Sequence, residues 1–214
     1  MVLKLKKYNC NKCKDKKHIF NVKTGIWEDC GCLKQNKIEE KYLTSHLPKL
    51  YWNYGWKDCL KDFESLSKEI YFLKKVVELQ LKSKGFKKFL YIYSENQEVG
   101  KCLVSVMFRE FIKKGLACNI ISLEQLVDAE FDKELRKEIV YDNYNIDCLC
   151  VLLGEEKQNK WNSVCFVKIH NHRKDLDKFT IFLSTKDIIK KIGMYGLSAT
   201  SLFSKMRKLR LNIE

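Results

Sequence analysis

The feature that most constrains the fold is a buried-strand pattern that runs directly into an altered phosphate-binding loop. The segment reads Phe89-Leu-Tyr-Ile-Tyr-Ser-Glu-Asn-Gln-Glu-Val-Gly-Lys-Cys102. A working loop reads G-x-x-x-x-G-K-[ST] and lies between a strand and a helix. Gly100 and Lys101 match this pattern. Glu95 stands at the first glycine and Cys102 at the hydroxyl residue. The segment predicts an α/β fold of the P-loop kind.

These replacements change the chemistry of the loop. In a working loop, backbone N–H groups surround the phosphate, the lysine reaches its oxygens, and the hydroxyl holds Mg²⁺. The thiol of Cys102 is a poor ligand for a hard cation, and Glu95 and Glu98 bring negative charge towards a polyanion. We therefore expect a vestigial nucleotide site at Gly100, Lys101 and Cys102 that binds ATP or ADP weakly or not at all.

Four cysteines near the amino terminus have the spacing of a metal site. Cys10 and Cys13 form a C-x₂-C pair, and Cys30 and Cys32 form a C-x-C pair sixteen residues further on. Two such pairs can close a tetrahedral all-sulfur zinc site. The alternatives are a site of three cysteines with His18, or free cysteines. Four protein ligands leave no open coordination position, so we expect a structural zinc ion.

The net charge indicates an anionic partner. The chain has 214 residues, with 41 basic and 27 acidic ones, and a formal charge of +14. Such a balance is typical of nucleic-acid contact, although solvated basic helix faces would give the same composition. We expect single-stranded DNA to contact two basic runs. The predicted contact residues are Lys168, Arg173, Lys174, Lys205, Arg207, Lys208 and Arg210.

The sequence has no sign of a membrane segment or of secretion. No apolar run approaches the ~20 residues that span a bilayer, and the basic start leads into no signal-peptide core. We therefore expect a soluble cytoplasmic protein with no membrane partner. Ten cysteines in such a chain predict reduced thiols or metal ligands, and the six outside the amino-terminal cluster are expected mostly as small core residues.

Hydrophobic periodicity predicts alternating strands and helices. Parallel strands covered by helices on both faces follow from this order. We predict a zinc knuckle and linker helix in residues 1–47 and the α/β domain in residues 48–214. The expected strands are 89–93, 117–121, 147–153 and 179–183. The expected helices are 34–47, 63–84, 101–114, 123–140, 162–173 and 201–210, and a short hairpin with Gly25 in its turn is expected between the cysteine pairs.

The order of these pieces resembles the DnaC-type replicative helicase loaders and the related IstB-type transposition ATPases, which are AAA+ proteins. The segments that carry the resemblance are the zinc element Cys10–Cys32, Leu47-Pro-Lys-Leu-Tyr51, the loop Tyr91–Lys101 and the sensor-like strand Thr180–Thr185. The resemblance implies an AAA+ P-loop domain with a three-layer parallel sheet. It also implies a hexameric replicative helicase as partner, and assembly with itself or with other AAA+ subunits.

The catalytic residues of that family are replaced here. Val151 and Leu152 stand where the family has two carboxylates, one for Mg²⁺ and one for the attacking water. Thr185 stands at the sensor asparagine, and Ser201 and Lys205 stand at two arginines. The resemblance, together with these losses, implies a pseudo-ATPase that is not an enzyme. Such a protein would act as a loader-like adaptor in DNA replication. The alternatives are a divergent, slow ATPase loader and an IstB-type transposition accessory protein.

Overall fold

The chain divides into two compact units. The computed structural model describes residues 10, 12–14, 16–82, 88–135, 139–153, 160–187, 201–203 and 206–211. The two units are Met1–Leu43 and Thr44–Glu214. The sequence analysis places the corresponding boundary after residue 47.

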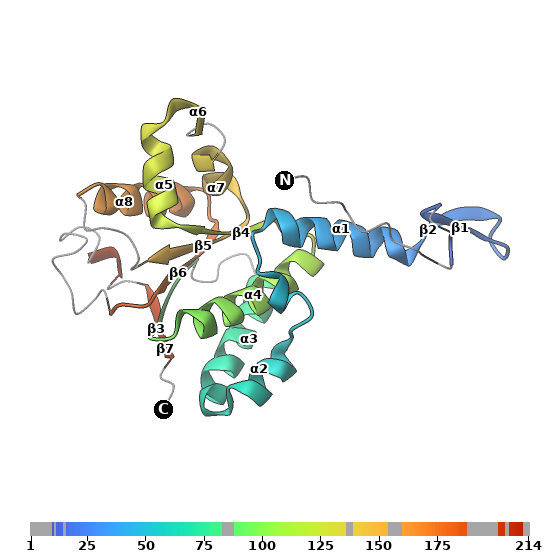
Figure 1. Ribbon diagram of the computed structural model, residues 1–214, viewed down its shortest axis with the longest axis horizontal. Helices are drawn as coiled ribbons and strands as arrows, with labels where there is room; N and C mark the ends of the chain where they lie inside the picture. The colour runs from blue at the N-terminus through green and yellow to red at the C-terminus, as the bar shows by residue number, and fades with distance from the viewer. Residues whose placement is uncertain are drawn as a thin grey trace. The chain divides into compact units, whose positions relative to one another are not determined.

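The first unit holds a hairpin and nearly all of one helix (Figure 1). Strands β1 (His18–Asn21) and β2 (Ile26–Asp29) pair in antiparallel fashion. Gly25 has a φ of +69° in the turn between them, a conformation that glycine adopts without strain. The predicted hairpin is therefore confirmed. Helix α1 (Gly31–Thr44) follows, and it begins three residues before the predicted helix.

The second unit is built on a five-stranded parallel sheet in the order β4-β5-β6-β3-β7. The four predicted strands are present at close to their expected bounds. They are β3 (Phe89–Ser94), β4 (Cys118–Ser122), β5 (Cys148–Leu153) and β6 (Phe179–Ser184).

The fifth strand corrects the sequence analysis. Residues 207–210 are predicted as part of a basic helix, but β7 (Arg207–Leu211) is a strand that pairs with β3. From Lys208 onward its sequence alternates between charged and apolar residues, and Leu211 is buried while Arg210 is exposed. That period of two favours an edge strand with one face on the core.

Helices cover both faces of the sheet, which gives three layers (Figure 1). On one face lie α2 (Trp56–Asp62), α3 (Ser67–Lys82) and α4 (Gln97–Lys113). On the other lie α5 (Leu123–Phe131), α7 (Tyr141–Asn145) and α8 (Lys160–Asp175). Shorter helices are η1 (Lys49–Tyr51), η2 (Glu64–Leu66) and α6 (Lys133–Leu135). No helix in the described ranges is both long and apolar enough to cross a bilayer.

The helix predicted over residues 123–140 is interrupted. Ser122 caps its start as expected, and its hydroxyl accepts a hydrogen bond from the backbone N–H of Gln125. The helix ends at Asp132, whose backbone is extended. The Asp132 carboxylate accepts hydrogen bonds from the backbone N–H groups of Glu134 and Leu135, and so begins α6. A short acidic side chain competes with the helix in this way because it satisfies N–H groups locally.

Alternating side chains of the central strands supply the core on each side of the sheet. Tyr91 and Phe182 belong to the cluster that packs with Phe166 of α8. On the opposite face, Leu183 lies against Gly100 in the first turns of α4. The amino end of α4 is therefore held firmly against the carboxyl end of the sheet, where parallel α/β folds place their ligands.

Candidate functional site

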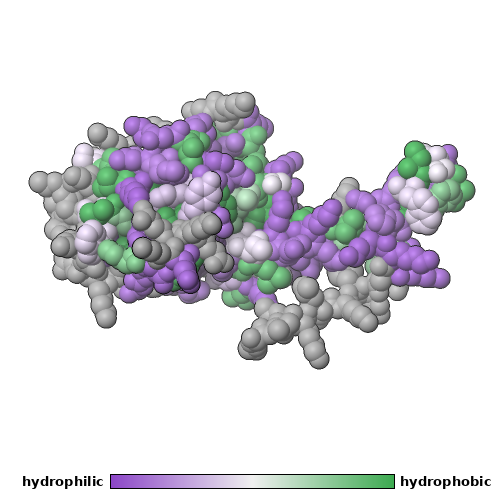
Figure 2. Space-filling model, turned by 90° about the horizontal axis from the view of Figure 1, so that it is seen from above, coloured by the Kyte–Doolittle hydropathy of each residue, from purple (hydrophilic) through white to green (hydrophobic). Residues whose placement is uncertain are grey.

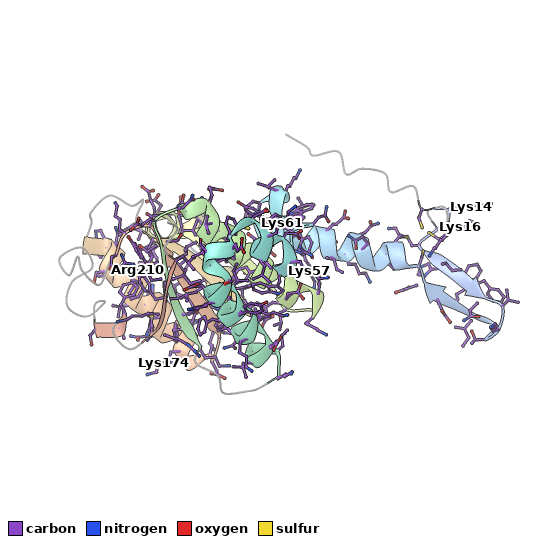
Figure 3. All side chains as sticks on the ribbon, turned by 90° about the horizontal axis from the view of Figure 1, so that it is seen from below. Lys14, Lys16, Lys57, Lys61, Lys174 and Arg210 are labelled. Atoms are coloured by element: carbon purple, nitrogen blue, oxygen red, sulfur yellow. The ribbon has the colours of Figure 1, made fainter. Side chains whose placement is uncertain are left out.

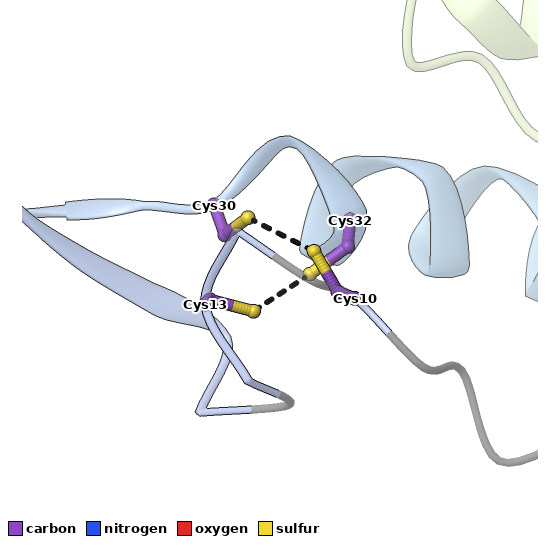
Figure 4. A group of neighbouring side chains, drawn as sticks. All are labelled: Cys10, Cys13, Cys30 and Cys32. Carbon is purple, nitrogen blue, oxygen red and sulfur yellow. Dashed lines mark hydrogen bonds between the residues drawn. The ribbon is translucent and has the colours of Figure 1, made fainter.

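The four amino-terminal cysteines converge on one point. Their Sγ atoms all lie within 4.8 Å of one another (Figure 4). The Sγ atoms of Cys10 and Cys30 are 3.7 Å apart, and those of Cys13 and Cys32 are 3.4 Å apart. In a tetrahedral thiolate site with Zn–S bonds of ~2.3 Å, neighbouring sulfur atoms are about 3.8 Å apart. The four cysteines can therefore hold a metal ion.

Two elements bring the cysteines together. Cys10 and Cys13 lie on a tight turn, and Cys30 and Cys32 lie at the junction of β2 and α1. A hydrogen bond from the backbone of Cys13 lowers the pKa of the Cys10 thiol to about 7. Burial raises the pKa of the Cys32 thiol, and its neighbouring thiols add to this effect. A bound cation would reverse that increase, because coordinating thiols are deprotonated.

The metal site is also the core of its unit. Among the described residues of Met1–Leu43, the buried apolar side chains are Cys13, Cys30, Cys32 and Tyr42. His18 does not join the cluster, because its Nδ1 lies 3.1 Å from a carboxylate oxygen of Asp29 on the paired strand. The alternative site with His18 is therefore not supported.

The loop after β3 differs from the predicted phosphate-binding loop. Only Glu95 and Asn96 separate β3 from α4, and α4 begins at Gln97 rather than at Lys101. The side-chain oxygen of Asn96 accepts hydrogen bonds from the backbone N–H groups of Glu98 (3.0 Å) and Val99 (3.4 Å). These are first-turn donors of the kind that bind a phosphate at a helix amino terminus. The chain's own side chain occupies them.

The three vestigial residues have partners within the protein. The Nζ of Lys101 lies 3.1 Å from the Gln97 side-chain oxygen and 3.5 Å from a carboxylate oxygen of Glu98. Cys102 is 1% exposed, and the pKa of its thiol is raised by a hydrogen bond with Cys59 and by burial. A protonated, buried thiol at this position leaves no ligand for Mg²⁺.

A hollow of about 470 Å³ lies beside the amino end of α4, and acidic residues line it. The lining residues are Glu95, Asn96, Gln97, Glu98 and Leu211. The hydroxyl of Tyr93 donates a hydrogen bond to Glu95, and an Arg210 nitrogen lies 4.0 Å from the same carboxylate. This environment does not favour a polyphosphate.

Near the carboxyl end of β5, aliphatic side chains stand at the two positions where carboxylates were expected in the family. Val151 is fully buried in β5 and pairs with Phe182, and Leu152 pairs with Leu183. Thr185 follows β6 at the same edge of the sheet. Neither aliphatic side chain can coordinate Mg²⁺ or orient water. Lys205 lies outside the described residues.

Arg173 is a structural residue, and the prediction that it contacts nucleic acid is wrong. Its side chain is 0% exposed. The guanidinium donates to the Thr180 hydroxyl and to backbone carbonyls of Asn143, Tyr144, Ile146, Asp147 and Phe179. Burial lowers its pKa to about 10, so it stays charged at neutral pH. Nothing in the spacing of the basic run distinguishes this arginine from its exposed neighbours.

The other predicted nucleic-acid residues differ in their surroundings. Lys168 forms an ion pair with Glu130 at 2.7 Å. Lys174 is exposed at the end of α8 (Figure 3). On β7, the Arg207 guanidinium lies 4.2 Å from the Phe72 ring centre and that of Arg210 lies 5.1 Å from the Tyr93 ring centre.

Two features of the site were missed in the sequence analysis. Asn96 precedes Gln97 and Glu98, and an asparagine before an acidic first turn is a typical helix-start signal. Tyr51 was noted only as part of a segment that carries the family resemblance, but its hydroxyl lies within 3.5 Å of the backbone and side-chain oxygens of Glu98. No local pattern links residues 47 positions apart.

Solved structures with a similar fold include the DnaC helicase loader, DnaI and the replication initiator DnaA. The DnaI structure superposes with a TM-score of 0.62 at 14% identity, over 79% of this chain and 93% of that one. The DnaC helicase loader superposes with a TM-score of 0.56 at 18% identity, over 77% of this chain and all of that one (100%). The chain thus has the fold of the DnaC helicase loader and of DnaI.

The AMPPCP-bound DnaA from Aquifex aeolicus has a TM-score of 0.60 at 17% identity over 79% of this chain. This chain spans about half, 52%, of the DnaA chain. No protein-family model matches the sequence, and no curated protein matches it. At these identities the likeness establishes the fold alone.

Proposed function

We propose that this chain is a DNA replication protein, a helicase-loader-like adaptor that binds a hexameric replicative helicase and single-stranded DNA without hydrolysing ATP. The similarity to the DnaC and DnaI structures supports the role in replication. Assembly with itself or with other AAA+ subunits belongs to the same proposal.

The observation that carries the loss of ATPase activity is the Asn96 cap. A nucleotide phosphate needs free backbone N–H groups at the start of the helix after β3. Here the Asn96 side chain accepts from two of them, at Glu98 and Val99. A bound phosphate would have to displace this cap and then approach the carboxylates of Glu95 and Glu98. ATP and ADP therefore bind weakly or not at all.

The missing catalytic groups point the same way. An arginine finger alone contributes about 10³–10⁵ in the rate of phosphoryl transfer, and metal ions neutralise the developing charge. Val151 and Leu152 cannot hold Mg²⁺, and the thiol of Cys102 is buried. No single substitution would restore the arginine finger, the carboxylates at Val151 and Leu152 and the Mg²⁺-binding hydroxyl at Cys102 together.

We propose that the four cysteines hold one structural zinc ion. An all-sulfur tetrahedral donor set is typical of structural zinc, and it has no open position for catalysis. Because the cysteines form most of the buried interior of their unit, the metal would supply much of its folding free energy.

The hairpin of this unit is the proposed contact for the helicase. Phe20 and Trp27 are partners on the paired strands, with ring centres 5.4 Å apart and ring planes tilted by 58°, yet they are 46% and 64% exposed. Val22 and Ile26 are 86% and 62% exposed. These side chains gather on the hairpin (Figure 2). Such exposed apolar groups are typical of protein interaction sites.

Co-purification with the host's replicative helicase tests the proposal. The full chain should retain the helicase, and Phe20→Ala with Trp27→Ala should weaken retention at least tenfold. Tyr71→Ala on α3 is the matched control, because Tyr71 is a 59% exposed aromatic residue in the other unit. Absence of helicase binding by the zinc-loaded wild type would refute the adaptor role.

Exposed cations of the second unit are the proposed DNA contacts. Lys174, Arg207, Lys208 and Arg210 remain from the predicted set, with Lys205 a prediction only. On single strands, log K falls with log salt by roughly 0.7 for each phosphate contacted. Replacing Arg207, Lys208 and Arg210 with glutamine should flatten this slope. The variant with Lys57→Gln and Lys61→Gln on α2 is the control (Figure 3). An equal flattening of the slope in this control would show that only the net charge of the protein matters, and not the position of the cations.

A divergent, slow ATPase is the second candidate. It is favoured by one observation, that Gly100 and Lys101 lie in the first turns of the helix after β3. Binding of a fluorescent ATP analogue that is lost in Lys101→Ala would support residual nucleotide binding. Binding that is unchanged in this variant would place the analogue elsewhere.

A further inference from the structure

A hollow of about 190 Å³ separates helices α5 and α8 on the face of the sheet opposite α4. Its lining includes Val127, Cys165 and Glu130. The carboxylate of Glu130 forms an ion pair with Lys168 and accepts a hydrogen bond from the Tyr144 hydroxyl. The lining is therefore electrically balanced. The volume is below the ~300 Å³ at which small-molecule sites begin, so it suits an inserted side chain.

Large apolar side chains surround this hollow and face solvent. Phe131 and Trp161 meet edge to face with ring centres 5.0 Å apart, and they are 60% and 41% exposed. Val164 is 54% exposed. Leaving these groups in water is unfavourable, at roughly 25 cal/mol for each Å² of apolar surface. Figure 2 looks onto this side of the unit, where apolar patches lie between hydrophilic ones.

The α5 side of the hollow is acidic in an otherwise basic chain. Residues 123–135 contain five carboxylates and one lysine, whereas the whole chain carries +14. Glu124 is three residues before Val127 and Asp128 is three residues before Phe131, so they lie beside the apolar stripe of α5. Within the described ranges, no cation forms an ion pair with Glu124, Asp128 or Glu134.

We propose that the α5–α8 groove binds an amphipathic helix of a partner protein that carries lysine or arginine beside its apolar face. An apolar helix face in a groove is a common mode of recognition, and here the acidic α5 side would select basic flanks. The same carboxylates oppose a nucleic acid at this surface. Lys168 would not attract phosphate either, because Glu130 neutralises it.

The test uses three labelled synthetic helical peptides with one leucine face and a polar face of lysine, glutamine or glutamate. The full chain should bind the lysine peptide at least tenfold more tightly than the glutamate peptide, measured by fluorescence anisotropy. The overall positive charge favours the opposite order, so this preference would have to be local. Equal binding of all three, or preference for glutamate, would overturn the proposal.

Two pairs of variants place the binding in the groove. Val164→Asn should weaken the lysine peptide at least fivefold, and Val22→Asn on the hairpin, an equally conservative change at an exposed valine, should not. Glu124→Lys with Asp128→Lys should weaken it at least tenfold, whereas Glu64→Lys with Glu78→Lys, both exposed on the other face of the sheet, should not. An unchanged affinity in Val164→Asn overturns the proposal. The proposal is also overturned if a single-stranded oligonucleotide competes with the lysine peptide and binds Val164→Asn more weakly than wild type.

Discussion

Leu183 fills the space that a side chain on Gly100 would need. A Cβ at Gly100 would lie 2.6 Å from the Cδ1 of Leu183, which is itself 1% exposed. The glycine that matches the phosphate-binding motif is therefore required by the packing of α4 on β6. Its presence does not by itself indicate a bound nucleotide.

Gly100→Ala should destabilise the protein by about 1–2 kcal/mol. Overpacking a tight core costs about 1–3 kcal/mol, and replacing a helical glycine offsets roughly 0.5–1 kcal/mol of that. Urea unfolding measures the change. Leu183→Val should relieve the clash, so the double variant should be more stable than the sum of the two single effects by at least about 0.5 kcal/mol. Strict additivity would show that the two positions do not meet.

Arg173→Met should destabilise the protein by about 3–5 kcal/mol, because it leaves several buried carbonyl oxygens without a donor. Its neighbour provides the control. Lys174 is exposed, so Lys174→Met should change stability by at most about 0.5 kcal/mol. If Arg173→Met unfolds at the wild-type urea concentration, the buried network does not hold α8 to the sheet.

The lowered pKa of Asp147 predicts that the protein loses stability in acid. Burial raises its pKa, but hydrogen bonds from Lys178 and from the backbone of Ala117 outweigh this and lower it below the ordinary 3.8. A carboxyl with a lowered pKa stabilises the fold above its ordinary pKa, and this stabilisation is lost as pH falls through the lowered value.

Asp147→Asn should therefore cost up to about 1 kcal/mol at pH 7, and the difference from wild type should shrink below about pH 4. Urea unfolding at several pH values measures this difference. The exposed Asp175→Asn is the control and should show little difference at any pH. A penalty for Asp147→Asn that is the same at pH 7 and pH 3 would contradict the assignment.

One zinc ion should be found for each chain purified without chelator. Cys13→Ser should abolish metal retention and unfold the first unit, with the α/β unit largely unaffected in its far-ultraviolet signal. Cys165→Ala, at a buried cysteine of the other unit, should keep one equivalent of zinc. Well under one equivalent in the wild-type protein would remove the basis for a metal-stabilised hairpin.

The sheet was predictable where patterns are local and strong. The apolar runs at Phe89–Ser94 and Cys148–Leu153 identify buried strands, and the alternation of strand and helix implies parallel pairing. The cysteine spacing identifies the metal cluster. β7 was misread because Arg207–Leu211 is short and basic, and its strand form depends on pairing with β3. Tertiary context overrides local propensity at such an edge.

The structure of the loop between β3 and α4 was only partly predictable. The replacements at Glu95 and Cys102 indicate a lost function from the sequence alone. The early start of α4 depends on the Asn96 cap and on packing between Gly100 and Leu183, which are 83 positions apart (183 − 100). The burial of Arg173 likewise depends on carbonyls from two separate segments of the chain, residues 143–147 and Phe179. Spacing within one basic run carries no information about such contacts.

The most direct test of the central claim is ATP turnover by the zinc-loaded chain with Mg²⁺, alone and with single-stranded DNA. The closed amino end of α4 and the aliphatic residues Val151 and Leu152 predict a rate no higher than that of Lys101→Ala. Turnover that is clearly above background and that Lys101→Ala abolishes would contradict the account, and would make the chain a divergent ATPase.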